Sequence, residues 1–282
     1  MDGFFLVNKQ KGMTSHDVVF KMKKKFHLDK IGHTGTLDPF ASGLLILCTG
    51  KATKLAHLFS NLDKVYEGSI AFGNHYDTYD TTGSIVETKD SIINQPQVEQ
   101  AMKDMIGSYD QLPPMYSAIK QNGRKLYELA RQGLDVKRET RLVSIYEFKM
   151  ISLLENNTCS FLASVSKGTY IRSVAVDLAE KLDTYAALDQ LKRLSVGKYS
   201  LQNSKSIEDI TKDDMISLEQ FFKDFPSITL NDYLIGLVKN GVYLDERQVI
   251  TDHPFIVYDE NHQMIAYYEV KAENQYKPVL IF

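Results

Sequence analysis

The feature that most limits what this chain can fold into is a polar, glycine-containing loop that runs straight into an apolar strand. Residues 32–43 read GHTGTLDPFASG, and the continuous apolar run Leu44–Cys48 follows directly. Such a run is typical of a buried strand. Pro39 restricts Asp38 to an extended conformation, so its carboxylate leaves the backbone in a fixed direction. Because functional side chains concentrate on loops, we expect Asp38 and the imidazole of His33 to lie at a functional site.

Local features alone favour a simpler role for Asp38. An aspartate before a proline often caps a short helix that begins at the proline, and Asp-Pro turns are common. In this interpretation, Asp38 contributes about 1 kcal/mol to folding and nothing to chemistry.

Charge is unevenly distributed along the chain. The formal net charge is −3, and residues 226–282 contain four basic and eight acidic side chains. This leaves 29 basic and 28 acidic side chains in residues 1–225, which is not the basic excess of a general nucleic-acid-binding domain. Any affinity for RNA must therefore come from local clusters of charge.

No pattern typical of a metal site, a membrane span or a secretory signal occurs in the sequence. Cys48 and Cys159 lie in apolar runs, where we expect buried thiols, and two cysteines are too few for a zinc cluster. There is no HExxH or CxxC motif and no apolar run near 18 residues. We therefore expect a cytoplasmic protein with no metal, no cofactor and no membrane contact.

Hydrophobic periodicity predicts an α+β fold. Strands are expected at residues 4–7, 44–48, 64–73, 142–153 and 158–165, and helices near 15–26, 50–59, 96–106, 125–131 and 171–182. Because these elements do not alternate as regular βαβ units, we expect a mixed, largely antiparallel sheet with flanking helices. Residues 200–225 are interpreted as a connection, and short strands follow it. This predicts a domain over residues 1–225 and a small β-rich domain over 226–282.

Arg172 is placed where a cation is unfavourable. The predicted helix presents Ile171, Val174, Ala175, Leu178 and Leu182 on one face, so Arg172 falls in its first turn. The helix dipole disfavours a positive charge there. We therefore expect a carboxylate partner for Arg172 from elsewhere in the chain.

Residues 115–141 form the most basic part of the chain. Cations at positions 120, 124, 125, 131, 137, 138 and 141, including Lys120 and Arg141, are interleaved with Tyr116 and Tyr127. Cations mixed with aromatic rings are typical of surfaces that bind single-stranded RNA.

Several motifs carry a resemblance to one known family. HTGTLDPFASGLL, residues 33–45, closely resembles the catalytic motif of the TruB family of tRNA pseudouridine synthases. Further motifs occur in the family's order, namely VNKQKGMTSH (7–16, with Gln10 where a proline is usual), KVY with DTYDTTG (64–66 and 77–83), PPMYSAIK (113–120), GTYIRS (168–173) and LDQLKRLSVG (188–197). The strands after residue 226 weakly resemble a shortened PUA-like RNA-binding module.

The resemblance implies a function and a set of site residues. It implies isomerisation of uridine 55 in the tRNA T-loop, in a pseudouridine synthase fold that needs no cofactor or metal. Asp38 would be catalytic and paired with Arg172, and Tyr66 would stack on the target base and assist catalysis. His33, Tyr170 and Leu191 would contact the flipped nucleotide, and Lys120 and Arg141 would bind the T-loop and T-stem. We expect the protein to act as a monomer.

Two other classes of function remain open from the residues alone. A non-catalytic RNA-binding protein would explain the basic segment 115–141 without using Asp38. A glycosidase-like enzyme would use Asp38 but would need a second carboxylate about 5–9 Å away, and no paired acidic motif is present. Leu191 and Tyr66 also have ordinary alternative roles, as core or cross-strand residues.

Overall fold

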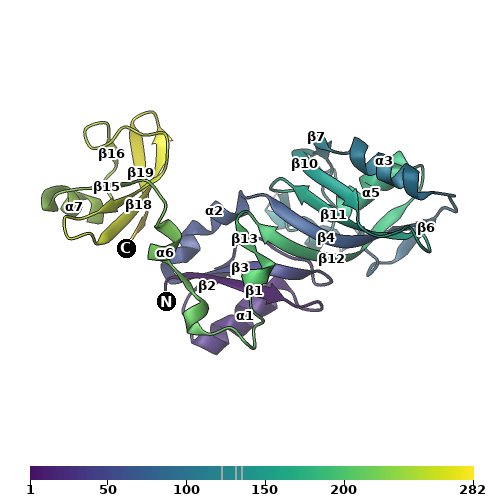
Figure 1. The fold of residues 1–282 in the computed structure, drawn as a ribbon, viewed down its shortest axis with the longest axis horizontal. Coiled ribbons are helices and arrows are strands. Elements are labelled where there is room, and N and C mark those ends of the chain that lie inside the picture. The colour runs from purple at the N-terminus through teal and green to yellow at the C-terminus, as the bar shows by residue number, and fades with distance from the viewer. Residues whose placement is uncertain (122, 131, 135) are drawn as a thin grey trace.

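The fold is built around one large mixed sheet with a smaller sheet at the C-terminal end (Figure 1). A computed structural model describes residues 1–121, 123–130, 132–134 and 136–282, without the side chains of Lys120, Gln121 and Lys125. Within this part of the chain, the large sheet contains ten strands. They are β1 (Gly3–Lys9), β2 (Ile31–His33), β3 (Ser42–Thr49), β4 (Lys64–Phe72), β7 (Gly107–Gln111), β10 (Arg141–Met150), β11 (Thr158–Val165), β12 (Ala186–Val196), β13 (Tyr199–Ser200) and β14 (Ile216–Ser217).

The strand order confirms the expected mixed, largely antiparallel sheet. The main path runs β14-β1-β3-β12-β4-β11-β10-β7, with β13 beside β12 and β2 beside β3. Between the strands of this sheet as described, pairing is antiparallel except for β12 and β3, where Lys192 lies opposite Ser42 and Arg193 opposite Gly43. Two small hairpins stand outside it, β5 (Asn74–Tyr76) with β6 (Ile85–Thr88) and β8 (Lys120–Gln121) with β9 (Arg124–Lys125).

Helices cover both faces of the sheet. The helices are α1 (Ser15–Phe26), α2 (Ala56–Ser60), α3 (Gln95–Asp104), α4 (Leu126–Ala130), α5 (Ile171–Lys181), α6 (Leu218–Phe222) and α7 (Asp232–Lys239), with 3-10 turns η1 (Gly50–Leu55), η2 (Leu201–Asn203) and η3 (Lys212–Asp214). The first helix begins directly after Thr14, which forms a reciprocal capping box with Asp17. Not one helix of the described residues is long and apolar enough to cross a bilayer.

The apolar run Leu44–Cys48 is buried on both faces, as a central strand requires. Leu45 and Leu47 join the core cluster under α1, α3 and α5. Leu44 and Ile46 point the other way, into a second cluster with η1, α2 and α6. This continuous burial explains why the segment lacks polar alternation.

The C-terminal strands form a separate five-stranded sheet, yellow in Figure 1. It has the order β15-β17-β18-β19-β16, from β15 (Ser227–Thr229), β16 (Leu244–Asp245), β17 (Phe255–Tyr258), β18 (Met264–Ala272) and β19 (Gln275–Ile281). One of its faces shares the second core cluster, because Ile256, Tyr267 and Leu280 pack with Phe4 and Phe222. The small sheet is therefore joined to the large one through apolar side chains.

The interpretation of residues 200–225 as a mere connection is wrong. This segment contributes β14, which extends the large sheet by pairing Ile216 with Phe4 and Ser217 with Gly3. It also contains α6, whose Phe222 is almost fully buried. A two-residue strand and a five-residue helix are too short to produce a periodic pattern in a sequence, and long-range packing decides their structure.

Candidate active site

Asp38 lies on the loop between β2 and β3, and it caps no helix. Residues 39–40 form a turn, in which the Ala41 N–H donates to the Asp38 carbonyl oxygen at 3.1 Å. The helix that local features favoured after Pro39 is absent from this described segment. The side chain of Asp38 is instead directed toward Arg172, so the capping interpretation is wrong.

Three buried polar side chains hold this loop in place. The Ser15 hydroxyl bonds both the N–H and the C=O of Leu37, at 2.8 and 3.0 Å. The Arg193 guanidinium donates to the carbonyl oxygens of Leu44, Gly35 and Thr36 at 2.8, 3.1 and 3.4 Å. The Lys9 ammonium donates to the carbonyl oxygen of Ala41, three residues after Asp38, at 2.6 Å.

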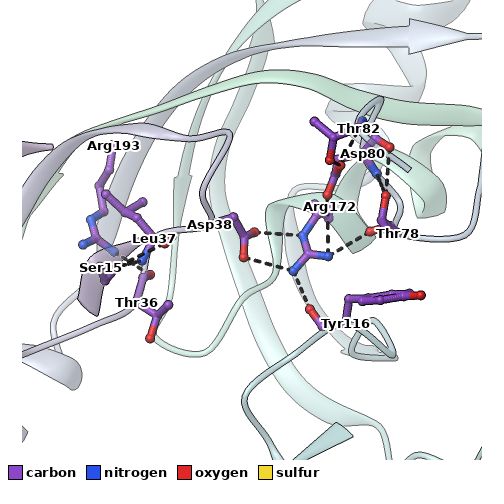
Figure 2. A network of polar contacts seen from close by, with 10 residues as sticks. All are labelled: Ser15, Thr36, Leu37, Asp38, Thr78, Asp80, Thr82, Tyr116, Arg172 and Arg193. Carbon is purple, nitrogen blue, oxygen red and sulfur yellow. Dashed lines mark hydrogen bonds and ion pairs between the residues drawn. The ribbon is translucent and has the colours of Figure 1, made fainter. Parts of the chain in front are cut away.

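Arg172 donates two hydrogen bonds to the Asp38 carboxylate, as Figure 2 shows. Nε donates to Oδ2 at 2.9 Å and Nη2 donates to Oδ1 at 3.2 Å. The other guanidinium contacts are the carbonyl oxygens of Thr78 (2.8 Å) and Tyr116 (2.7 Å), and the Asp80 carboxylate at 3.8 Å. This confirms that a carboxylate compensates for a cation in the first turn of α5. Charge-assisted, two-pronged pairs of this kind also fix direction.

The burial of these groups is unequal. The side chains of Arg172 and Asp80 are 5% and 6% exposed, whereas that of Asp38 is 34% exposed. Burial raises the pKa of Asp38, the positive charge of Arg172 acts against this, and the carboxylate of Asp80 raises the pKa further. Asp38 is thus a partly accessible carboxyl group whose pKa is raised overall, beside a fixed cation that favours its charged form. This combination suits a nucleophile or a general base.

The other predicted site residues come from four different elements. Tyr66 on β4 is 8% exposed, and Leu191 on β12 is equally buried and belongs to the same core cluster. Tyr170 is the N-cap of α5, and the guanidinium carbon of Arg141 lies 5.7 Å from the centre of its ring. Leu191 also borders a surface pocket of about 200 Å³.

His33 and Lys120 require separate description. His33 ends β2. Burial is the main cause that lowers the pKa of its imidazole, and the positive charge of Arg193 lowers it further. The ring is therefore neutral near pH 7, and its Nδ1 has no hydrogen-bond partner within the described part of the chain. The side chain of Lys120 lies outside the described residues, so its predicted RNA contact stays a prediction.

Comparisons with known proteins give one consistent family. Residues 23–171 match the model of the TruB family pseudouridylate synthase N-terminal domain. The chain belongs to this family. It is 52% identical to "tRNA pseudouridine synthase B" of Aster yellows witches'-broom phytoplasma and 49% identical to that of Acholeplasma laidlawii, with full coverage of both chains in each case.

Solved structures of low sequence identity show the same fold. A chain in "Crystal Structure of a Cbf5-Nop10-Gar1 Complex" superimposes with a TM-score of 0.72 at 21% identity, covering 96% of this chain and 79% of that one. A chain in "Structure of H/ACA RNP bound to a substrate RNA containing 2'-deoxyuridine" gives a TM-score of 0.69 at 19% identity, with 99% and 83% coverage. The family member described here thus has the pseudouridine synthase fold with a PUA-like C-terminal module.

Sequence reasoning missed three residues of the site. Asp80 lies within the quoted motif DTYDTTG, and that match was the available signal for it. Lys9 and Arg193 also lie within quoted motifs, VNKQKGMTSH and LDQLKRLSVG, but a lone cation in an otherwise ordinary strand usually points to solvent. Both are almost completely buried. Burial also lowers the pKa of Lys9 to about 8, despite the nearby charge of Asp38. Among the described residues, no group of His, Cys, Asp and Glu side chains could hold a metal ion.

Proposed function

We propose that this protein is a tRNA pseudouridine synthase that isomerises uridine 55 in the T-loop of tRNA, with Asp38 as its catalytic carboxylate. The observation that carries the proposal is the two-pronged pair between Arg172 and a partly exposed Asp38. Close relatives named tRNA pseudouridine synthase B support the substrate class. The domains are proposed to span residues 1–225, for catalysis, and 226–282, for RNA binding.

The reaction breaks one bond and forms another without gain or loss of atoms. The N1–C1′ glycosidic bond breaks, the uracil turns, and C5 bonds to C1′; the proton on C5 is lost, and N1 ends protonated. Asp38 acts either as the nucleophile at C1′ or as the base that removes the 2′ proton to give a glycal intermediate. In both routes Arg172 favours the charged carboxylate and fixes its direction.

Binding of the target nucleotide has to offset the loss of its stacking in RNA. Flipping a base out of a stack costs a few kcal/mol, and stacking on an aromatic ring returns about 1–3 kcal/mol. We assign this stacking role to Tyr66 and give it a supporting part in removal of the C5 proton. Tyr170, Leu191 and the neutral imidazole of His33 complete the proposed base pocket.

The phosphate backbone of the T-loop and T-stem is assigned to the basic segment 115–141. Arg141 is assigned first, because its guanidinium lies against the Tyr170 ring. Lys120 is assigned to the same surface from its sequence position. We further infer that the protein works in the cytoplasm, since its proposed substrate is a tRNA, and that it acts as a monomer.

The glycosidase-like alternative is disfavoured by the surroundings of Asp80. This second carboxylate is 6% exposed and faces inward to Arg172. It also accepts hydrogen bonds from the N–H and hydroxyl of Thr82. A carboxylate with these partners has no open face on which to activate water.

Tritium release tests the proposal. A tRNA transcript carrying tritium at C5 of uridine is incubated with the wild-type protein and with Asp38→Asn, and a transcript with cytidine at position 55 is the substrate control. We expect wild-type protein to release one equivalent per tRNA, and Asp38→Asn or the cytidine transcript to release none. Wild-type protein that binds tRNA tightly without releasing tritium would leave only an RNA-binding function. Appearance of free uracil would instead indicate glycosidase chemistry.

A further inference from the structure

The buried amide of Gln111 holds both backbone polar groups of Tyr170. Gln111 ends β7 and has no exposed surface. Its Oε1 accepts the Tyr170 N–H at 2.8 Å, and its Nε2 donates to the Tyr170 carbonyl oxygen at 3.2 Å. One side chain thus replaces the pairing that a neighbouring strand would give. The Tyr170 N–H has no other hydrogen-bond partner among the contacts of the described residues, and a buried N–H without a partner is unfavourable.

A second pair of residues fixes which way the amide points. Tyr109, two residues earlier on the same face of β7, donates its hydroxyl proton to Asp177 at 2.8 Å. The Tyr109 oxygen can therefore only accept the bond from Gln111, and Nε2 donates to it at 2.7 Å. The reversed amide would lose the bond to Tyr109 and place two donors together at Tyr170. Asp177 lies on α5, so β7 holds this helix at both its N-cap and its second turn.

The residue opposite Gln111 contacts the same tyrosine. Arg141 of β10 is the register partner of Gln111, and its guanidinium lies against the Tyr170 ring. Two residues after Tyr170, Arg172 leaves the first turn of α5 and pairs with Asp38. A shift of the N-cap would therefore move the Tyr170 ring and the Arg172 guanidinium together.

We propose that Gln111 is a positioning residue for catalysis, which sets the start of α5 and through it both Tyr170 and Arg172. This rests on the function proposed above. Gln111 does not touch the substrate or the Asp38 carboxylate. Its effect reaches the reaction only through the position of the two α5 residues.

The test compares Gln111→Met, which keeps the shape but removes both amide bonds, with Ser173→Ala. Ser173 is also buried on α5 and donates to Leu112 O at 2.7 Å, so its loss breaks a bond between the same two segments without touching Tyr170. We expect Gln111→Met to lower the single-turnover rate of tritium release by about 10- to 100-fold, with tRNA affinity within threefold of wild type. Ser173→Ala should keep the wild-type rate. At saturating enzyme this rate constant does not depend on the fraction of molecules that are folded.

A readout independent of activity separates this inference from the proposed function. Fluorotyrosine at position 170 gives a ¹⁹F NMR signal, which we expect Gln111→Met to shift or broaden and Ser173→Ala to leave unchanged. A Gln111→Met rate within twofold of wild type would overturn the inference. If wild-type protein is inactive, the proposed function fails. In that case the ¹⁹F signal still tests the structural part of the inference, because an unchanged signal in Gln111→Met would show that Gln111 does not position Tyr170.

Discussion

Arg172→Lys separates the charge of the arginine from its geometry. The guanidinium makes four hydrogen bonds, two to Asp38 and one each to the carbonyl oxygens of Thr78 and Tyr116. An ammonium keeps the charge but donates three bonds from a single point. At least one of these four acceptors then lacks its partner, which costs about 1–3 kcal/mol. The carboxylate also loses its two-pronged hold.

We therefore expect Arg172→Lys to lose about 2 kcal/mol of unfolding free energy and at least about 100-fold in the single-turnover rate. Urea denaturation measures the first, and tritium release with excess enzyme measures the second. The matched control is Arg247→Lys, because Arg247 makes the same two-pronged contact with Asp245 on the exposed surface of the C-terminal sheet. That variant should behave as wild type in both assays. A rate for Arg172→Lys within threefold of wild type would refute the reasoning, since charge alone would then suffice.

Two further predictions concern a buried carboxyl group and the stacking ring. Burial raises the pKa of Asp177 to about 6 from 3.8. The stabilising contribution of this carboxyl group is complete below pH 3.8 and is lost as the pH rises through 6. Between pH 4 and 7, the free energy of unfolding of Asp177→Asn should therefore rise relative to that of wild type by up to about 2–3 kcal/mol. Urea unfolding across this range measures the gain, and a constant difference would contradict it. Tyr66→Ala removes the ring and should lose about 10- to 100-fold in kcat/KM, with weaker tRNA binding. Tyr66→Phe keeps the ring and should bind tRNA as wild type does. Equal tRNA affinity of the two variants would exclude stacking.

Local signals predicted the parts of the fold that depend on local physics. The apolar periodicity of residues 15–26 and the apolar run Leu44–Cys48 specify α1 and β3 within a few residues of their observed ends. The mismatch between Arg172 and the helix dipole correctly predicted a carboxylate partner, although neighbouring residues could not say which one. That choice depends on Asp38, which lies 134 residues away in the sequence.

The anchors of the Asp38 loop could not be predicted for the same reason. Arg193 reaches the loop because β12 pairs in parallel with β3. Gly43 allows this approach, since a Cβ atom there would lie 2.3 Å from the Arg193 carbonyl oxygen. Neither the pairing nor the close contact produces a periodic pattern in the sequence. A lysine in a strand, such as Lys9, likewise gives no sign that it is buried.

The distance along the chain between these partners also affects how the protein is made. The Asp38 loop emerges early from the ribosome, but Arg172 follows 134 residues later, and Arg193 bonds Leu44 from a position 149 residues downstream. Domains generally fold as their segments become available during synthesis. A nascent chain that ends before β12 therefore carries the Asp38 loop without Arg193, and one that ends before α5 lacks Arg172 as well. If Asp38 is catalytic as proposed, fragments that end before Arg172 should be inactive on RNA.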